Sequence, residues 1–191
     1  NPEINNCGNC TSCLDSCPTE AFDSEYNLDS RKCISYLTIE HKGVFPMSLR
    51  KKIGNKIYGC DDCLSVYPWN KFSEITSEKE FFAKKTLINP ELKKFLVLKE
   101  CNFNFFFQKS PIKRIGWVRF MRNVIIATGN SQNKDLGAYL IKFLDSEYPI
   151  LRGASIWSLK QLITIKDFNY IKKKFVSKEK NSYVKFEWEH N

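Results

Sequence analysis

The chain has 191 residues, of which 42% are hydrophobic and 14% aromatic, and this apolar content excludes a wholly disordered protein. No apolar run approaches the roughly 20 residues that a membrane-spanning helix needs, and no signal-peptide pattern opens the chain, so we expect a cytoplasmic protein without a membrane partner. The formal charge of +9 favours an anionic partner such as nucleic acid.

Seven of the eight cysteines lie between Cys7 and Cys63. The first four, with the proline that follows them, have the spacing C-x2-C-x2-C-x3-C-P, which is typical of bacterial ferredoxins with two clusters. In that motif the first three cysteines bind one cluster, and the fourth binds the other. We therefore predict one iron–sulfur cluster at Cys7, Cys10 and Cys13, and assign Cys17 to a second.

Later cysteines complete the second predicted cluster but not the first. Cys33, Cys60 and Cys63 supply three thiolates, which make a set of four with Cys17. By the same spacing, the missing ligand of the first cluster falls just before a proline, at Tyr67, and a phenol is a harder and poorer ligand than a thiolate. That cluster is then three-iron, ligated from outside or lost, unless Tyr67 marks a decaying gene or a sequence error. A structural zinc site is the alternative, but it suits isolated C-x2-C pairs better.

The segment 71–109 has a mixed composition, with charged residues around Glu78–Glu80 and an aromatic stretch at Phe103–Phe107. We predict a linker that contains helices. Cys101 falls outside any ligand spacing, and we expect it to be a buried thiol.

The chain becomes helical in pattern after residue 110 and contains an internal repeat. Pro111-Ile-Lys-Arg114 aligns with Pro149-Ile-Leu-Arg152 at an offset of 38 residues, and a period of about 40 with two helices per unit is typical of HEAT-like repeats. We predict such repeats over 110–176 and a basic, polar tail over 177–191. The expected fold class is thus α+β: a ferredoxin-like two-cluster domain over 1–70, followed by an all-α HEAT-like domain. A generic helical bundle is the alternative for the second part.

No acidic residue occurs between Cys101 and Lys134. A merely solvated face normally mixes charges of both signs, so this stretch favours a phosphate-binding surface. Backbone N–H groups in the first turn of a helix add to phosphate binding. The candidate residues are Lys109, Ser110, Lys113, Arg114, Arg119 and Arg122.

Several segments resemble the C-terminal half of tRNA epoxyqueuosine reductase. They are Cys7-Gly-Asn-Cys-Thr-Ser-Cys-Leu-Asp-Ser-Cys-Pro-Thr19, Cys33-Ile-Ser-Tyr-Leu-Thr-Ile-Glu40, Tyr58-Gly-Cys-Asp-Asp-Cys63 with Pro68-Trp-Asn70, and Ser110-Pro-Ile-Lys-Arg-Ile-Gly116 with Arg122-Asn123 and Gly129-Asn130. The resemblance covers most of the chain outside 71–109 and the segment after Lys166.

The resemblance implies an oxidoreductase that binds cobalamin and two [4Fe-4S] clusters, and that reduces epoxyqueuosine to queuosine at the tRNA wobble position. In the family, the clusters pass electrons singly to the cobalt, and a carboxylic acid delivers a proton. The main cobalamin cradle and that acid lie in an N-terminal domain that this sequence does not contain. We therefore expect a portion of the protein to precede Asn1, no catalytic residue in this chain, and no activity of this chain alone.

The resemblance also implies partners and cofactor contacts. Ser35 and Tyr36 follow the ligand Cys33 and are predicted to touch the corrin, or else simply to hydrogen-bond the cluster loop. The expected partners are the tRNA anticodon region, which offers phosphates and splayed bases, the N-terminal cobalamin domain if it is a separate chain, and an external electron donor.

Two other functions stay open at the level of sequence. A stand-alone ferredoxin-like electron carrier has the cysteines, but does not need the repeat or the acid-free basic stretch. A related corrinoid reductase, such as a reductive dehalogenase, shares the two-cluster layout but is normally exported.

Overall fold

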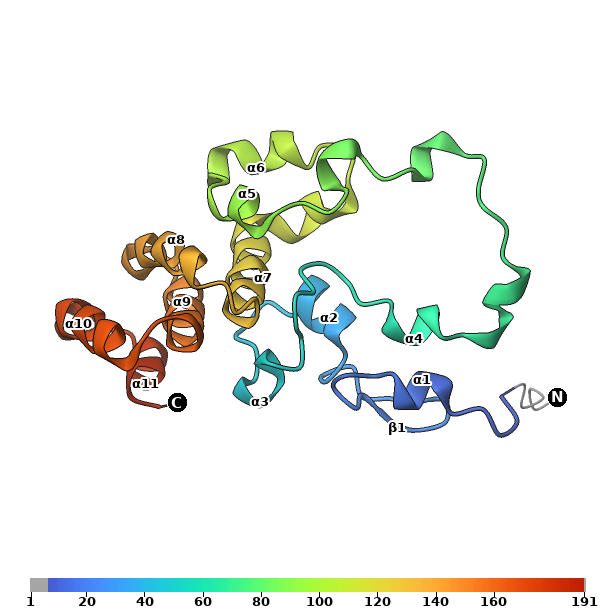
Figure 1. Cartoon of the computed structure of the whole chain (residues 1–191), viewed down its shortest axis with the longest axis horizontal. Coiled ribbons are helices and arrows are strands. Elements are labelled where there is room, and N and C mark those ends of the chain that lie inside the picture. The colour runs from blue at the N-terminus through green and yellow to red at the C-terminus, as the bar shows by residue number, and fades with distance from the viewer. Residues whose placement is uncertain (1–6, 191) are drawn as a thin grey trace.

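The computed structural model describes residues 7–190, and it is mostly helical with one two-stranded sheet. The cysteine-rich segment lies on one side, a helical region lies on the other, and a long arc connects them (Figure 1). No helix within the described residues is long and apolar enough to cross a membrane.

The cysteine-rich segment is built from short elements that alternate with turns. Phe22 pairs with Leu28 in the antiparallel sheet, so this part has the mixed character expected from the sequence. The elements are α1 (Ser12–Asp15), β1 (Phe22–Ser24), β2 (Asn27–Leu28), α2 (Ile34–Ile39), α3 (Met47–Arg50) and α4 (Asp62–Ser65).

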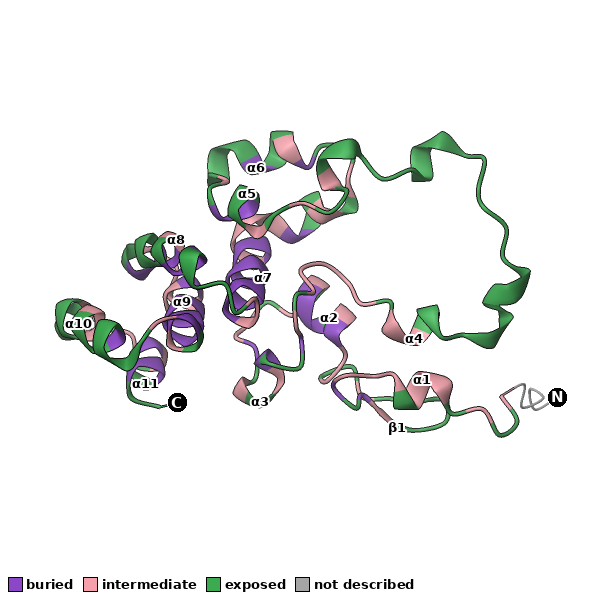
Figure 2. Cartoon of the chain, in the orientation of Figure 1, coloured by how far each residue is buried: buried purple, intermediate pink, exposed green. Residues whose placement is uncertain are grey.

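The connecting arc is exposed along nearly its whole length (Figure 2). It carries three 3-10 turns, η1 (Pro68–Phe72), η2 (Lys79–Phe81) and η3 (Lys85–Leu87), and leads into α5 (Leu92–Leu96) and α6 (Glu100–Phe106).

The aromatic stretch beside α6 packs into the core, as its composition suggests. Phe103 and Phe107 are buried, and their rings lie 5.5 Å and 4.8 Å from that of Phe120. The prediction for Cys101 is wrong, because its thiol is exposed. Phe103 of helix α6 is buried, whereas Cys101 and Phe105 lie on the solvent side of the same short helix.

The helical region is organised around two long helices, α7 (Gly116–Asn130) and α9 (Pro149–Leu162), which pack along one another and hold most of the buried residues (Figure 2). A Cβ on Gly129 would lie 2.7 Å from Ser158 Oγ, so only glycine permits this close approach of the helices. The other elements are η4 (Pro111–Ile115), η5 (Lys134–Leu136), α8 (Gly137–Ile141), η6 (Lys142–Asp145), α10 (Ile165–Phe175), η7 (Val176–Lys178) and α11 (Ser182–Glu189).

The two prolines of the sequence repeat both start helical segments. Pro111 opens η4 and Pro149 opens α9, where a missing N–H costs no hydrogen bond. The repeat differs at its first copy, because Gly116 has a φ of 75° and separates the 3-10 turn from α7. The aligned helices α7 and α9 pack against each other, as successive repeats do.

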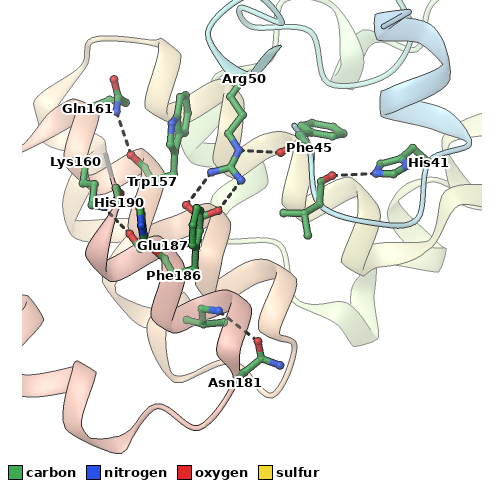
Figure 3. Close-up of polar contacts among 12 residues, drawn as sticks. His41, Phe45, Arg50, Trp157, Lys160, Gln161, Asn181, Phe186, Glu187 and His190 are labelled. Carbon is green, nitrogen blue, oxygen red and sulfur yellow. Dashed lines mark hydrogen bonds and ion pairs between the residues drawn. The ribbon is translucent and has the colours of Figure 1, made fainter. Parts of the chain in front are cut away.

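The polar tail predicted over 177–191 is wrong, since residues 182–189 form helix α11. Val184 and Trp188, four residues apart, are buried against the rest of the helical region. Glu187 is also buried and accepts hydrogen bonds of 2.9 Å and 2.6 Å from the Arg50 guanidinium (Figure 3). The partner of Glu187 lies 137 residues away in the chain, so composition gives no sign of the pair.

This pair predicts a large stability difference for one amide substitution. Replacing Glu187 by Gln leaves Arg50 buried without a counter-charge, which costs about 3–5 kcal/mol and lowers the melting temperature by about 10 °C. Glu20→Gln is the matched control, because Glu20 pairs with Lys52 at 2.8 Å on an exposed surface, where water screens the pair. The measurement is thermal unfolding followed by circular dichroism. Equal losses in the two variants would contradict the argument from burial.

Candidate iron–sulfur centre

Four cysteines from three separate segments line one cavity of about 60 Å³. They are Cys17, Cys33, Cys60 and Cys63, the same set that the sequence analysis groups in one cluster. The cavity walls between them are largely apolar and include Ala21, Phe22, Leu28 and Ile34. The arrangement offers four sulfur ligands between largely apolar walls.

The local backbone structure determines the position of each of these cysteines. Cys17 ends the turn after α1, and its sulfur accepts a 3.3 Å hydrogen bond from the backbone N–H of Ala21. Cys33 is the N-cap of α2. Cys60 follows Gly59, whose φ of 80° favours glycine. Cys63 lies within α4.

The thiols of the cavity differ in acidity. Burial raises the pKa of Cys17, but hydrogen bonds from Ala21 and Thr19 outweigh it, and the net pKa is lowered. Burial raises the pKa of both Cys60 and Cys63, and the nearby sulfurs of Cys33 and Cys17 add to the rise at Cys63. Bringing thiolates together without a cation is therefore unfavourable, and iron supplies the compensating positive charge.

The geometry also bears on the choice between a cluster and zinc. Within residues 7–190, no three His, Cys, Asp or Glu side chains stand close enough to share a single metal ion. In a cubane each thiolate binds a different iron, so its ligands stand apart around a larger body. Four cysteines around one cavity match that donor set.

The first predicted cluster has three cysteines in one loop. The backbone N–H of Cys10 donates to Cys7 O at 3.0 Å, and Cys13 lies in α1. The hydroxyl of Ser12 lowers the pKa of the Cys10 thiol. Tyr67 precedes η1 and is 51% exposed. Its role as the occupant of the fourth ligand position stays a prediction.

Three of the predicted phosphate contacts have other partners in the structure. Arg122 is 1% exposed. Its guanidinium donates to the carbonyl of Leu37 in α2, and to those of His41 and Gly43, which follow α2. Arg119 donates to Ile39 O at 2.9 Å. Arg114 pairs with Glu40 at 2.6 Å on the surface. The prediction is wrong for Arg122, because burial keeps it from any phosphate, and Arg119 is largely committed to the backbone.

The remaining predicted contacts stay available. Lys109 and Lys113 are exposed, and Ser110 uses its hydroxyl to cap η4 by accepting from Ile112 N–H.

Near the cavity, Tyr36 is 39% exposed and Ser35 is partly buried. Their contact with a corrin stays a prediction.

The sequence analysis missed two polar residues that support the cysteines, Thr38 and Asn123. Both are buried and hydrogen-bonded to backbone around the ligand segments. Their signal was a polar side chain inside an apolar helical pattern, where a buried polar group needs a partner.

A family model described as a 4Fe-4S double cluster binding domain matches residues 6–70. The epoxyqueuosine reductase of Salmonella typhimurium is 40% identical over 162 residues, which are 85% of this chain and 42% of that protein. The epoxyqueuosine reductase of Francisella cf. novicida is 50% identical over 125 residues, which are 65% of this chain and 34% of that protein.

Solved structures agree over nearly the whole chain. The epoxyqueuosine reductase of Bacillus subtilis superposes with a TM-score of 0.90 at 31% identity, covering 98% of this chain and 50% of that one. An epoxyqueuosine reductase crystallised with an epoxyqueuosine-modified tRNA stem loop superposes with a TM-score of 0.89 at 32% identity, covering 96% of this chain and 48% of that one. The chain thus spans about half the length of the relatives it matches.

The first cluster provides a direct test of the ligand assignment. If Tyr67 occupies the missing ligand position, Tyr67→Cys raises the iron content of the anaerobically reconstituted chain. The content should then approach that of two cubanes, about eight iron atoms per chain. Ser73→Cys is the control, because it adds a thiol to the same exposed arc six residues later. Iron and acid-labile sulfide are measured per chain. An equal gain in both variants, or none in Tyr67→Cys, would refute the assignment.

Proposed function

Because the chain belongs to the epoxyqueuosine reductase family, we propose that it is the iron–sulfur and tRNA-docking half of tRNA epoxyqueuosine reductase. The observation that carries the proposal is the cavity lined by Cys17, Cys33, Cys60 and Cys63 within a fold that superposes on these reductases. The reaction itself is proposed for the intact protein, since the chain spans about half of its relatives' length.

The proposed chemistry sets what this half must supply. Removing an epoxide oxygen as water and leaving an alkene consumes two electrons and two protons. Iron–sulfur clusters carry electrons one at a time, so an external donor must deliver two in succession. Cobalamin, when bound by the intact protein, supplies the cobalt centre that acts on the epoxide carbon.

Within this chain, the proposed role of the cysteine cavity is to hold one [4Fe-4S] cluster close to the surface. Cys17, Cys33, Cys60 and Cys63 are its proposed ligands, and Tyr36 lies on the exposed side of α2, three residues beyond Cys33. Ser35 and Tyr36 are the proposed contacts with the corrin. A second cluster at Cys7, Cys10 and Cys13 is proposed with an incomplete ligand set.

The proposed docking surface for tRNA lies at the start of the helical region. Lys109 precedes η4, Lys113 lies within it, and both are exposed. Backbone phosphates attract such exposed cations, and each contact between a lysine and a phosphate releases condensed counterions from the RNA. The proposed location is the cytoplasm, where the tRNA substrate is found.

Two measurements on the purified chain test the function. We expect iron and sulfide equivalent to at least one cubane after anaerobic reconstitution, and binding to an anticodon stem loop at low salt. A stand-alone electron carrier would retain the cluster and fail to bind the stem loop. A chain that holds no iron would refute the proposal.

The tRNA surface makes a quantitative prediction. Replacing Lys109 and Lys113 by Ala removes up to two phosphate contacts, so the slope of log K against log salt falls by up to about 2. The measurement is stem-loop binding by fluorescence anisotropy across a salt series. The control is Lys166→Ala with Lys173→Ala, which removes the same charge from exposed positions on α10, at the far end of the helical region (Figure 1). Equal slopes for the two double variants would show that only net charge matters.

A further inference from the structure

One side chain of α7 joins two of the three backbone segments that carry the proposed ligands of the four-cysteine cavity. The amide nitrogen of Asn123 donates to Thr38 O, in α2, and to Ile57 O, in the loop before α4, at 2.8 Å each. Asn123 is 1% exposed. Its oxygen is also used, because it accepts 3.0 Å and 2.9 Å hydrogen bonds from Arg122. The amide is therefore fixed in orientation.

A second bridge lies next to the first. Thr38 is fully buried, and its hydroxyl donates to Ile34 O at 2.8 Å and accepts from the Gly59 N–H at 3.0 Å. The Gly59 N–H belongs to the residue directly before Cys60, and Ile34 is the residue directly after Cys33. The hydroxyl thus connects the neighbours of two proposed ligands.

We propose that Thr38 and Asn123 are positioning residues for the cluster in the four-cysteine cavity, and that they hold the Cys33 segment and the Cys60 segment at a fixed separation. This inference rests on the proposed function, since it requires a cluster at that cavity. Thr38 and Asn123 are not among the residues that line the four-cysteine cavity. Each acts on the backbone that carries a ligand.

The separation of the ligand segments matters for a redox centre. Ligand geometry, hydrogen bonding and solvent access set the reduction potential of an iron–sulfur cluster. Helix α2 is only six residues long, and the segment around Gly59 lies outside any helix or strand, so their own secondary structure does not fix the distance between them. The side chains from α7 and α2 provide that constraint.

The chain contains a matched control on the same helix. Asn130 also donates two 2.8 Å hydrogen bonds to backbone carbonyls, those of Arg50 and Gly54, neither of which adjoins a cysteine. Asn123→Ala and Asn130→Ala therefore each remove two donated hydrogen bonds from α7, and only the first touches the ligand segments. Asn123→Ala also removes the acceptor of two hydrogen bonds from Arg122. We expect both to lower the melting temperature.

The cluster readouts separate the two variants. In anaerobically reconstituted chain, we expect Asn123→Ala to shift the midpoint potential, to change the electron paramagnetic resonance spectrum of the reduced cluster, and to lose iron to a chelator about fivefold to tenfold faster than the parent. Asn130→Ala should match the parent in all three. A purely structural role would not produce this difference.

Thr38 gives an independent test that does not depend on Asn123→Ala folding. Thr38→Val removes the hydroxyl at similar volume, and should change the potential and the rate of iron loss in the same direction as Asn123→Ala. It should also speed hydrogen exchange at the Gly59 amide, which loses its acceptor. Thr38→Ser keeps the hydroxyl and should restore the parental potential.

The outcomes distinguish this inference from the proposed function. A parent that holds iron, with Asn123→Ala and Thr38→Val indistinguishable from Asn130→Ala in potential, spectrum and iron loss, overturns the positioning role alone. A parent that holds no iron overturns the proposed function, and the positioning role with it.

Discussion

The structure depends on how the last turn of α2 obtains donors for its carbonyl groups. A helix end leaves its final carbonyls without intrahelical partners, and in α2 these belong to residues 36–39. The backbone N–H of Glu40 donates to Tyr36 O. Three side chains of α7 donate to the other carbonyls: Arg122 to Leu37 O, Asn123 to Thr38 O and Arg119 to Ile39 O. Burial lowers the pKa of Arg122 to about 9, so it stays charged at neutral pH. The negative end of the α2 dipole and the ring of Phe45, 4.0 Å away, face that charge.

This arrangement explains how a small cysteine-rich unit obtains a fixed shape. Within 7–65 the buried side chains are Thr19, Ala21, Ile34, Leu37, Thr38, Phe45, Arg50 and Ile53, too few for an independent core. Helix α7 supplies a packed wall, and the Arg50–Glu187 pair adds a second attachment through α11. A cluster would add a third restraint from inside, because four ligands from distant segments must meet around it. The helical region is therefore part of the support of the proposed cluster site.

The sequence predicted what depends on local spacing, and failed where the partner is distant. The helix starts at Pro111 and Pro149 follow from local intervals, and the structure places them accordingly. The grouping of Cys17, Cys33, Cys60 and Cys63 as ligands stays a prediction, and all four line one cavity. The role of Arg122 was misread, because a basic residue in an acid-free stretch looks the same whether it faces phosphate or the end of another helix. The burial of Glu187 could not be predicted from its polar surroundings in the sequence, because its partner Arg50 lies 137 residues away. Charge counts describe a segment, whereas burial is decided by the rest of the fold.

The basic residues around α7 divide by type, and the division has a physical reason. A guanidinium presents five donors in a planar fork that several carbonyls can share, whereas an ammonium is a strongly hydrated point charge. The arginines at 119 and 122 accordingly serve backbone carbonyls, while Lys109 and Lys113 remain exposed at the start of the same helical segment. The buried side of α7 thus anchors the ligand segments, and its entry carries the cations proposed for phosphate. The proposed phosphate-binding lysines lie directly before α7, Lys113 within η4, and α7 in turn donates hydrogen bonds to the segments that carry the proposed ligands.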